Sequence, residues 1–388
     1  MSVQGLADKT SRFSTRTGWD IGESSLAAAI RQAKAAGREL VDLTVSNPTV
    51  CGFEYGSVLD ALADPKAMVY DPDARGIRSA REAVAAYYAD HGAEVDPDEV
   101  ILTTSTSEAY GYLLRVLCNA GDEVLAAQPS YPLFDYLADL EDVTLRAYPL
   151  FYDFGWWIDF AELERRITPR TRAILLVHPN NPTGHTTGRV ERERLEAICL
   201  RHGLALVVDE VFLDYGLEAP VESFARGPHP VLTFVVSGLS KICGLPQMKV
   251  AWMAGFGPEA ERRQALGRLE IVADTFLSMN APMQHALPIW LAERGGIQRQ
   301  ILGRVRENLA IVRRSGIEVL AMEAGWSAIL RTPSALSAES LISGPGVSVH
   351  PGSFYGIGER NRMVISLLGR RDVLMRGLEL LRQECESN

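Results

Sequence analysis

The chain has 388 residues, of which 47% are apolar and 23% charged, and its net charge is -10. This composition excludes an intrinsically disordered chain and is sufficient for one large core or two unequal ones. The negative charge is spread along the sequence with no basic stripe, which argues against nucleic acid or an anionic membrane as a partner. The five cysteines show no CxxC spacing, so we expect reduced thiols and no metal site. No apolar run is long enough to cross a membrane and the first residues lack a signal peptide, so we expect a cytoplasmic protein.

The first expected element is a helix over residues 23–37, which ends at a glycine. Short runs rich in Val, Ile and Leu then alternate with longer helical segments, and they predict strands at 100–105, 123–128, 173–178, 205–210, 232–237 and 250–256. Most of these runs are apolar at consecutive positions, so helices are expected on both faces of a largely parallel sheet.

The last quarter of the chain has a different pattern. A long helix is expected over 293–315, after an early pair of glycines. Strands are expected near 326–331, 347–350 and 362–367, before a final helix. This order predicts a smaller α+β unit. We find neither an internal repeat nor a low-complexity linker, so the two parts are expected to pack closely.

Polar residues at the carboxyl ends of parallel strands lie where such sheets bind ligands. Lys241 follows a strand in the segment SGLSKICGLPQMK, and Asp209 ends the strand ALVVDE. A single lysine is usually a solvated surface charge. A carboxylate at a buried strand end, however, is partly desolvated unless it meets a cation, and a protonated pyridine nitrogen would serve.

Two further segments follow strands. HPNNPTG supplies Asn181 in a turn made rigid by Pro182, although an ordinary turn explains that sequence equally well. TTSTSEA opens a helix with Ser105, Thr106 and Ser107, and its free backbone N–H groups would suit a phosphate. Simple helix capping is the alternative explanation of these hydroxyls.

These four segments, in this order, resemble the fold type I pyridoxal 5'-phosphate (PLP) enzymes, specifically the class I and II aminotransferases. LTVSNPT at 43–49, Tyr70 ahead of Gly76, and QPSYP extend the resemblance over nearly the whole chain. The resemblance implies an α/β fold: a large domain with a mostly parallel seven-stranded sheet between helices, and a smaller α+β domain. It also implies boundaries, with an N-terminal arm and helix at 1–45 that contribute to the small domain. The large PLP-binding domain would be 46–288, and the interdomain helix and small domain 289–388.

The resemblance assigns a role to each matching position. Lys241 would hold PLP as an imine and later move a proton between the substrate Cα and the cofactor. Asp209 would keep the pyridine nitrogen protonated, so that the ring accepts electrons. Asn181 would donate to the phenolic oxygen of the ring, and Tyr131 would lie flat on it.

The remaining assignments concern the phosphate and the substrate. The phosphate would be bound by Ser105, Thr106, Ser107 and Ser237. Tyr70 matches a residue that, in this family, reaches the phosphate of the neighbouring subunit, which implies a homodimer. Ser46, Asn47 and Asn181 would contact the amino acid or 2-oxo acid substrate.

Three positions depart from the family pattern. Phe212 replaces a tyrosine that would donate to the phenolic oxygen, and Lys249 replaces an arginine that would bind the phosphate with two hydrogen bonds. Val364 replaces the arginine that usually binds the substrate carboxylate. A carboxylate in a dry site needs a cationic or multi-donor partner. Arg331 and Arg362 are the nearby candidates, and we favour Arg331 because it ends a strand.

Aminotransferase activity is the leading hypothesis, with several alternatives. A PLP-dependent lyase that catalyses β-elimination would use the same fold and electron sink. A catalytically silent PLP-binding regulatory protein is a second alternative, and a nucleotide-binding α/β protein is disfavoured because no GxGxxG or GxxxxGK[ST] motif follows a strand. Trp326, Phe354 and Tyr355 are interpreted as core or interface residues rather than determinants of specificity.

Overall fold

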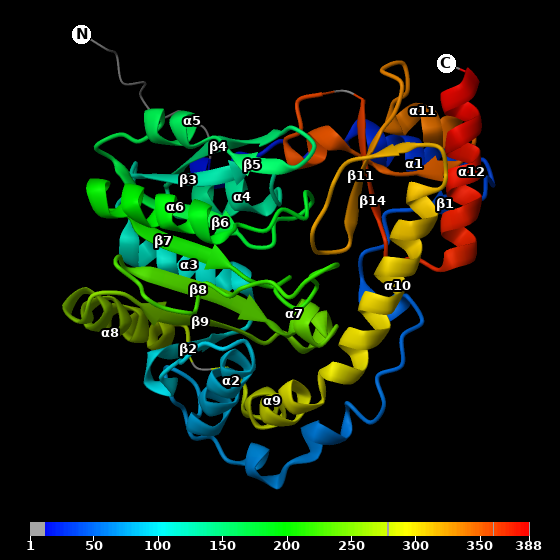
Figure 1. Ribbon diagram of the computed structural model, residues 1–388. Coiled ribbons are helices and arrows are strands. Elements are labelled where there is room, and N and C mark those ends of the chain that lie inside the picture. The colour runs from blue at the N-terminus through cyan, green and yellow to red at the C-terminus, as the bar shows by residue number, and fades with distance from the viewer. Residues whose placement is uncertain (1–11, 278, 360, 388) are drawn as a thin grey trace.

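Two structural units lie side by side in the computed structural model, which describes residues 12–277, 279–359 and 361–387. The larger unit contains an eight-stranded sheet, and the smaller contains a four-stranded sheet and a two-stranded pair (Figure 1). Helix α10 (Gly295–Arg313) leads from the large unit to the small one (Figure 1). The predicted helix at 293–315 is therefore confirmed, with the glycine pair at its first turn.

The large sheet has the strand order β2-β9-β8-β7-β6-β3-β4-β5. Its strands are β2 (Val100–Thr103), β3 (Glu123–Gln128), β4 (Thr144–Tyr152), β5 (Trp156–Ile158), β6 (Thr171–Val177), β7 (Ala205–Asp209), β8 (Thr233–Gly238) and β9 (Ala251–Phe256). Strands β8, β7, β6, β3 and β4 are parallel, whereas β2, β9 and β5 are antiparallel to their neighbours. The sheet thus has eight strands rather than the predicted seven, because the hairpin β4–β5 adds an edge strand of three residues.

Both faces of this sheet are covered by helices, as predicted. Along β7, Leu206 and Val208 belong to one buried cluster while Ala205 and Val207 belong to another. Since successive side chains of a strand point to opposite faces, each face of β7 packs against its own apolar layer. This double burial explains the consecutive apolar residues of the central strands.

The helices of the two units have clear bounds. They are α1 (Ser25–Ala35), α2 (Arg78–Asp90), α3 (Thr106–Leu117), α4 (Leu133–Leu140), α5 (Phe160–Arg165), α6 (Arg189–His202), α7 (Leu239–Ile242), α8 (Glu259–Thr275), α9 (Ala281–Glu293), α10, α11 (Ala338–Ser343) and α12 (Arg371–Ser387). None of the helices in the described ranges has the length and apolarity that a membrane crossing requires.

The small unit combines both ends of the described chain. Strand β1 (Val41–Asp42) pairs in parallel with β12 (Val347–Ser348), and α1 packs against α11. The four-stranded sheet has the order β10-β11-β14-β13, with β10 (Glu318–Val319), β11 (Ser327–Arg331), β13 (His350–Pro351) and β14 (Arg362–Ser366). The single strand expected at 347–350 is therefore two short strands that join different sheets. The domain boundaries at 45 and 288 stay predictions.

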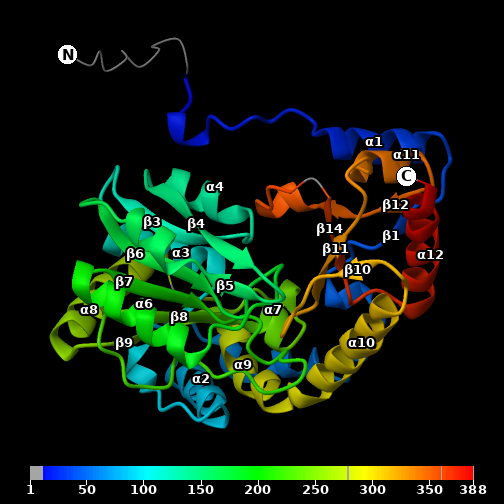
Figure 2. The ribbon, with the colours of Figure 1, turned by 45° about the horizontal axis from the view of Figure 1, so that its top comes forward.

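The segment before α1 crosses from one unit to the other (Figure 2). The short helix η1 (Thr15–Thr17) contacts α4 of the large unit, whereas α1 packs in the small unit. The Arg16 guanidinium donates to the carbonyl of Leu140 at 3.2 Å, and the Trp19 indole donates to Asp139 at 2.8 Å. These contacts attach the N-terminal segment to the large unit.

Two glycines within helices provide a matched test of packing. A Cβ on Gly377 in α12 would lie 2.7 Å from Leu43, whereas a Cβ on Gly303 in α10 would meet nothing within 4 Å. We expect G377A to lower the free energy of unfolding by about 1–3 kcal/mol through overpacking. G303A should raise it by up to about 1 kcal/mol, because alanine favours a helix. Urea denaturation of both variants measures this difference, and equal effects would contradict the packing of α12 on β1.

Candidate active site

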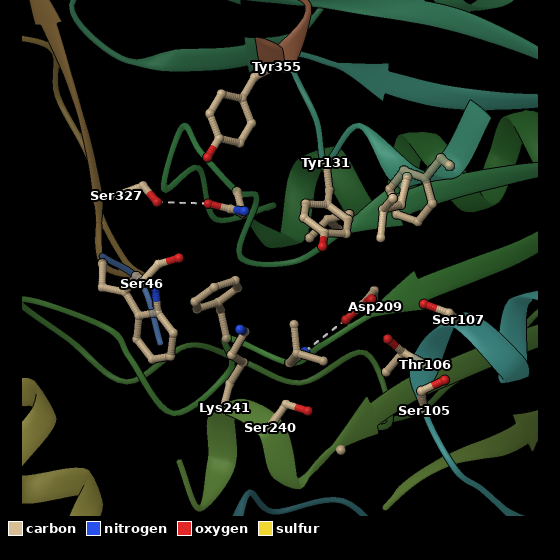
Figure 3. A pocket seen from close by; sticks show the side chains of 18 of the residues that line it. Ser46, Ser105, Thr106, Ser107, Tyr131, Asp209, Ser240, Lys241, Ser327 and Tyr355 are labelled. Carbon is tan, nitrogen blue, oxygen red and sulfur yellow. Dashed lines mark hydrogen bonds between the residues drawn. The ribbon is translucent and has the colours of Figure 1, made fainter. Parts of the chain in front are cut away.

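A cavity of about 300 Å³ lies where the carboxyl ends of β6, β7 and β8 face the small unit. Its wall includes Asp209 and Lys241 from the large unit, and Ser327 and Val364 from the small unit. Figure 3 shows that the labelled side chains converge on a common space. This position matches the ligand site expected of a parallel α/β sheet.

Asp209 is a buried carboxylate at the end of β7. The Tyr110 hydroxyl donates to its Oδ2 at 2.7 Å, and the backbone N–H of Val211 donates to its Oδ1 at 3.0 Å. Burial raises the pKa of Asp209 to about 6, and these two hydrogen bonds oppose the rise. No salt bridge to Asp209 occurs among the described residues, so this carboxylate lacks a cationic partner in direct contact.

Lys241 lies in the short helix α7, directly after β8. Burial lowers the pKa of its amine, while the negative charge of Asp209 acts in the opposite direction. The amine lies 5.2 Å from the centroid of the Trp326 ring and 5.9 Å from that of Phe212. A desolvated amine of this kind is deprotonated more easily, which favours nucleophilic and base chemistry.

Asn181 connects the two units of the molecule. The hydroxyl of Ser327, on β11, donates to Asn181 Oδ1 at 2.9 Å (Figure 3). This bond leaves the Nδ2 amide of Asn181 as a donor toward the cavity. Its neighbour Asn180 has a structural role, since its Oδ1 accepts from the backbone and hydroxyl of Thr183 within the turn.

The amino-terminal end of α3 forms the polar side of the cavity. Ser105, Thr106 and Ser107 all line it (Figure 3). The Ser105 hydroxyl accepts from the backbone N–H of Glu108 at 3.1 Å, so it is also the N-cap of the helix. The phosphate hypothesis and the capping hypothesis are therefore compatible. Lys249 reaches the same cavity from a left-handed backbone conformation, with φ of 52°.

The assignment of Ser237 to the phosphate is wrong. Its side chain is fully buried, does not line the cavity, and its Oγ has no hydrogen-bond partner within the described structure. Ser237 shares a face of β8 with Val235, and the next residue, Gly238, lies on the cavity side. Ser240, in α7, lines the cavity.

Aromatic and aliphatic side chains also line the cavity that contains Asp209. Tyr131 and Val211 both line the cavity, and Tyr131 keeps 45% of its surface exposed. Phe212 packs edge-on against Trp326, with ring centroids 4.9 Å apart. Trp326 and Tyr355 line the cavity as well, so they are site residues, whereas the sequence suggested only core or interface roles.

Three further predicted positions have different outcomes. Ser46 lines the cavity. Asn47 does not, because its side chain caps the short helix η2 (Pro48–Val50) by accepting from the backbone N–H of Thr49 at 3.1 Å. Tyr70 is 78% exposed and lies away from the cavity of its own chain. Its predicted contact with a neighbouring subunit therefore stays a prediction.

The preference for Arg331 as the carboxylate-binding residue is wrong, and Arg362 is not better placed. The two arginines face each other across β11 and β14, at the end of the strands opposite to Ser327. Neither lines the cavity. The Arg331 guanidinium pairs with Glu318 at 3.1 Å, and that of Arg362 donates to Asn361 at 2.7 Å.

Sequence reasoning missed Tyr110, Ser240, Ser327, Ser366 and His350 as cavity residues. Ser240 directly precedes Lys241 in the segment SGLSK, and this adjacency is the sequence signal that could have identified it. Tyr110 lies four residues after Thr106 on α3, but its contact with Asp209 depends on how α3 packs against the large sheet. The residues of the small unit have no local sequence signal, since their place follows from strand pairing between distant segments.

The fold and the cavity together define a PLP-type α/β transferase. The chain belongs to the aminotransferase class I and II family, whose family model matches residues 19–373. Members of this family are PLP-dependent.

Curated relatives and solved structures agree with this membership. The chain is 32% identical, over 71% of its length, to the alanine aminotransferase of Mycobacterium tuberculosis. It is 29% identical, over 69% of its length, to the glutamate-pyruvate aminotransferase AlaA of Escherichia coli. The matched segments span 66% of the length of these relatives. The solved structure of an alanine aminotransferase from Pyrococcus furiosus has the same fold, with a TM-score of 0.89, 19% identity, and coverage of 97% of this chain and 100% of that chain.

The residues present in the cavity fit PLP. A buried carboxylate without a cationic partner suits a protonated ring nitrogen, and an amine at the other side suits the aldehyde. The hydroxyls and free N–H groups at the start of α3, together with Lys249, suit a phosphate. The chemistry of these donors therefore matches the whole cofactor.

Removing the Tyr110 hydroxyl should weaken cofactor binding. Y110F leaves the buried carboxylate of Asp209 with one donor fewer, which raises its pKa further above about 6. We expect PLP affinity near neutral pH to fall about 10-fold, and the fall to be larger below that pKa. Titration with PLP, followed by absorbance at one pH above and one pH below the pKa of Asp209, measures the two dissociation constants. Y112F is the control, because Tyr112 is on the same helix and packs against Phe276.

Proposed function

We propose that the chain is a PLP-dependent aminotransferase, which moves an amino group between an L-amino acid and a 2-oxo acid in two alternating half-reactions. The observation that carries the proposal is the pair of Lys241 and Asp209. A desolvated amine and a buried carboxylate line one cavity, with Tyr131 and Val211 beside the space between them. The family membership supports the same activity.

PLP, when bound, supplies the electron sink that stabilises negative charge at the substrate Cα. In the proposed mechanism, Asp209 holds a proton at the pyridine nitrogen, and Tyr110 keeps the Asp209 carboxylate ionised by donating to it. The Lys241 amine would take a proton from the substrate Cα and deliver it to the former aldehyde carbon of the cofactor, two bonds away. Burial lowers the pKa of this amine, which favours its neutral, basic form.

Other cavity residues orient the groups and exclude water. The Asn181 amide donates to the phenolic oxygen of the cofactor, and Ser327 fixes that amide by donating to its Oδ1. Tyr131 and Val211 line the cavity and would pack against the cofactor ring. Ser105, Thr106 and Ser107 would hold the phosphate, with Ser240 in place of the Ser237 first expected.

Alanine and glutamate are the first amino donors to test, with pyruvate as the first acceptor. The printed names of two relatives carry these substrates, alanine aminotransferase and glutamate-pyruvate aminotransferase. The alignment covers only 66% of the length of each relative, so the choice of substrate is part of the proposal.

We also propose a cytoplasmic location, because the five cysteines of the chain are free thiols. Recovery from a membrane or extracellular fraction would contradict it.

A spectral half-reaction tests the activity. The purified protein loaded with PLP should absorb in the imine region, and an amino donor should convert this band to that of the pyridoxamine form. K241A should bind PLP without the imine band, and should lose conversion by several orders of magnitude because both nucleophile and base are removed. K249A serves as a control for loss of a nearby positive charge.

The products separate the alternatives. Formation of ammonia or hydrogen sulfide from a donor with a β leaving group, without the pyridoxamine form, would instead support a lyase. Stable PLP binding with no turnover of any donor would support the regulatory alternative. Failure to bind PLP at all would overturn the proposal.

A homodimer is proposed as the active form, with Tyr70 contacting the phosphate of the neighbouring subunit. Tyr70 is 78% exposed, and the adjacent Met68 and Val69 are 88% and 63% exposed, which makes an apolar surface suited to a partner. We expect a dimer in sedimentation experiments. Y70F should remain dimeric and bind PLP about 10-fold more weakly, since one hydrogen bond to a charged group is lost. A monomeric active protein, or unchanged affinity in Y70F, would contradict this arrangement.

A further inference from the structure

The valine that replaces the usual carboxylate-binding arginine has a histidine as its strand neighbour. In the antiparallel pair β13–β14, His350 lies directly opposite Val364. Residues opposite each other in such a pair point to the same face of the sheet. Both residues line the cavity. An imidazole is therefore present next to the position at which a guanidinium is expected.

Aromatic contacts hold the imidazole of His350 in place. Its ring stacks on Phe354, with centroids 5.1 Å apart and planes 9° apart, and the ring of Tyr355 meets it edge-on at 6.0 Å. Within the described structure, neither ring nitrogen of His350 forms a hydrogen bond with another residue. The ring is thus positioned, while its two nitrogens are available to a ligand.

The charge of His350 is not fixed by a protein partner. Burial lowers its pKa, and the negative charge of Asp42, on β1, opposes this change. Tyr355, on the following 3-10 helix η7 (Gly352–Tyr355), stays neutral near physiological pH because burial raises its pKa to about 12. Arg362, two residues from Val364 on β14, directs its guanidinium to Asn361. An anion that enters the cavity would therefore supply the missing counter-charge.

The other cations of the cavity have roles at the cofactor. Among the described residues that line it, the remaining basic side chains are Lys241 and Lys249. Under the proposed function, one is the nucleophile and the other lies at the phosphate. Two hydroxyls on the substrate side retain free protons. The Ser366 hydroxyl accepts from the backbone N–H of Leu368, and the Tyr355 hydroxyl has no hydrogen-bond partner within the described structure.

We propose that His350, as an imidazolium, binds the α-carboxylate of the substrate, with the hydroxyls of Tyr355 and Ser366 as additional neutral donors. The inference rests on the proposed function, and it names the group of the substrate that this side of the cavity recognises. A carboxylate binds the protonated imidazole with a charge-assisted hydrogen bond. His350 therefore replaces the guanidinium as a cation that depends on pH.

The presence of a histidine in place of an arginine makes the affinity for a carboxylate depend on pH. Free His350 loses its proton as pH rises through its pKa, and the neutral ring does not attract an anion. The dissociation constant of a carboxylate should therefore be constant between the pKa of the ligand's own carboxyl group and the pKa of His350, and should rise tenfold per pH unit above the latter. An arginine would give no such dependence, because its guanidinium stays charged.

The test uses propionate, a carboxylate without an amine, and the PLP-loaded enzyme. Its dissociation constant is measured against pH by calorimetry, while the imidazole proton resonances of the protein give the pKa of His350. We expect propionate to raise that pKa. H350Q should weaken propionate binding about 10- to 100-fold at the acidic end of the range and remove the pH dependence. H202Q is the control, since His202 pairs with Glu164 at the surface.

A rescue variant makes the test independent of folding defects. H350Q combined with V364R places a permanent cation beside the same site, and it should restore propionate affinity without restoring the pH dependence. An H350Q enzyme that keeps its PLP absorbance, binds propionate within twofold of wild type and retains the pH slope would overturn the inference. In that case a half-reaction with amino donors would still support the aminotransferase, whereas absence of PLP binding would remove the proposed function itself.

Discussion

The burial of one carboxylate, that of Asp209, is the constraint on which the site depends. It lies at the end of a strand covered on both faces, and its only hydrogen-bond donors in the described structure are Tyr110 and the N–H of Val211. A buried charge of this kind is costly unless a cation compensates it. The fold keeps this carboxylate buried, because it lies where the parallel strands β6, β7 and β8 end. The amine of Lys241 and the start of α3 lie at the same edge of the sheet. A cofactor with a protonated ring nitrogen and a phosphate would supply a cation to the Asp209 carboxylate and an anion to the free N–H groups at the start of α3.

The central part of this arrangement could be predicted from the sequence. The central strands of the large sheet are apolar at consecutive positions, and a residue at the end of such a strand has a defined location. Asp209, Asn181 and Lys241 were found in this way, and all three line the cavity. The errors have a common geometric origin. Ser237 is one position from the cavity side of β8, and one position on a strand reverses the direction of the side chain.

The small unit was harder to predict because its contribution depends on pairing between distant segments. Arg331 and Ser327 belong to the same strand, yet only Ser327 reaches the cavity, since four residues of a strand span roughly 13 Å. The sequence indicated the strand but not which end faces the large unit. His350 was missed for a related reason: its position beside Val364 follows from the register of β13 and β14. The eighth strand of the large sheet, β5, is three residues long and has too little periodicity to detect.

The pairing of β1 with β12 has a consequence for biosynthesis. Val41 is the register partner of Val347, and its backbone N–H donates to the carbonyl of Gly346, so nearly the whole described chain separates two neighbouring strands. All strands of the large sheet leave the ribosome before residue 347 is made. During synthesis the large unit can therefore acquire its core first, while the early segment that includes α1 and β1 waits without its partner strand. The nascent chain is exposed at this segment to proteases and to chaperones until the last strands have been added.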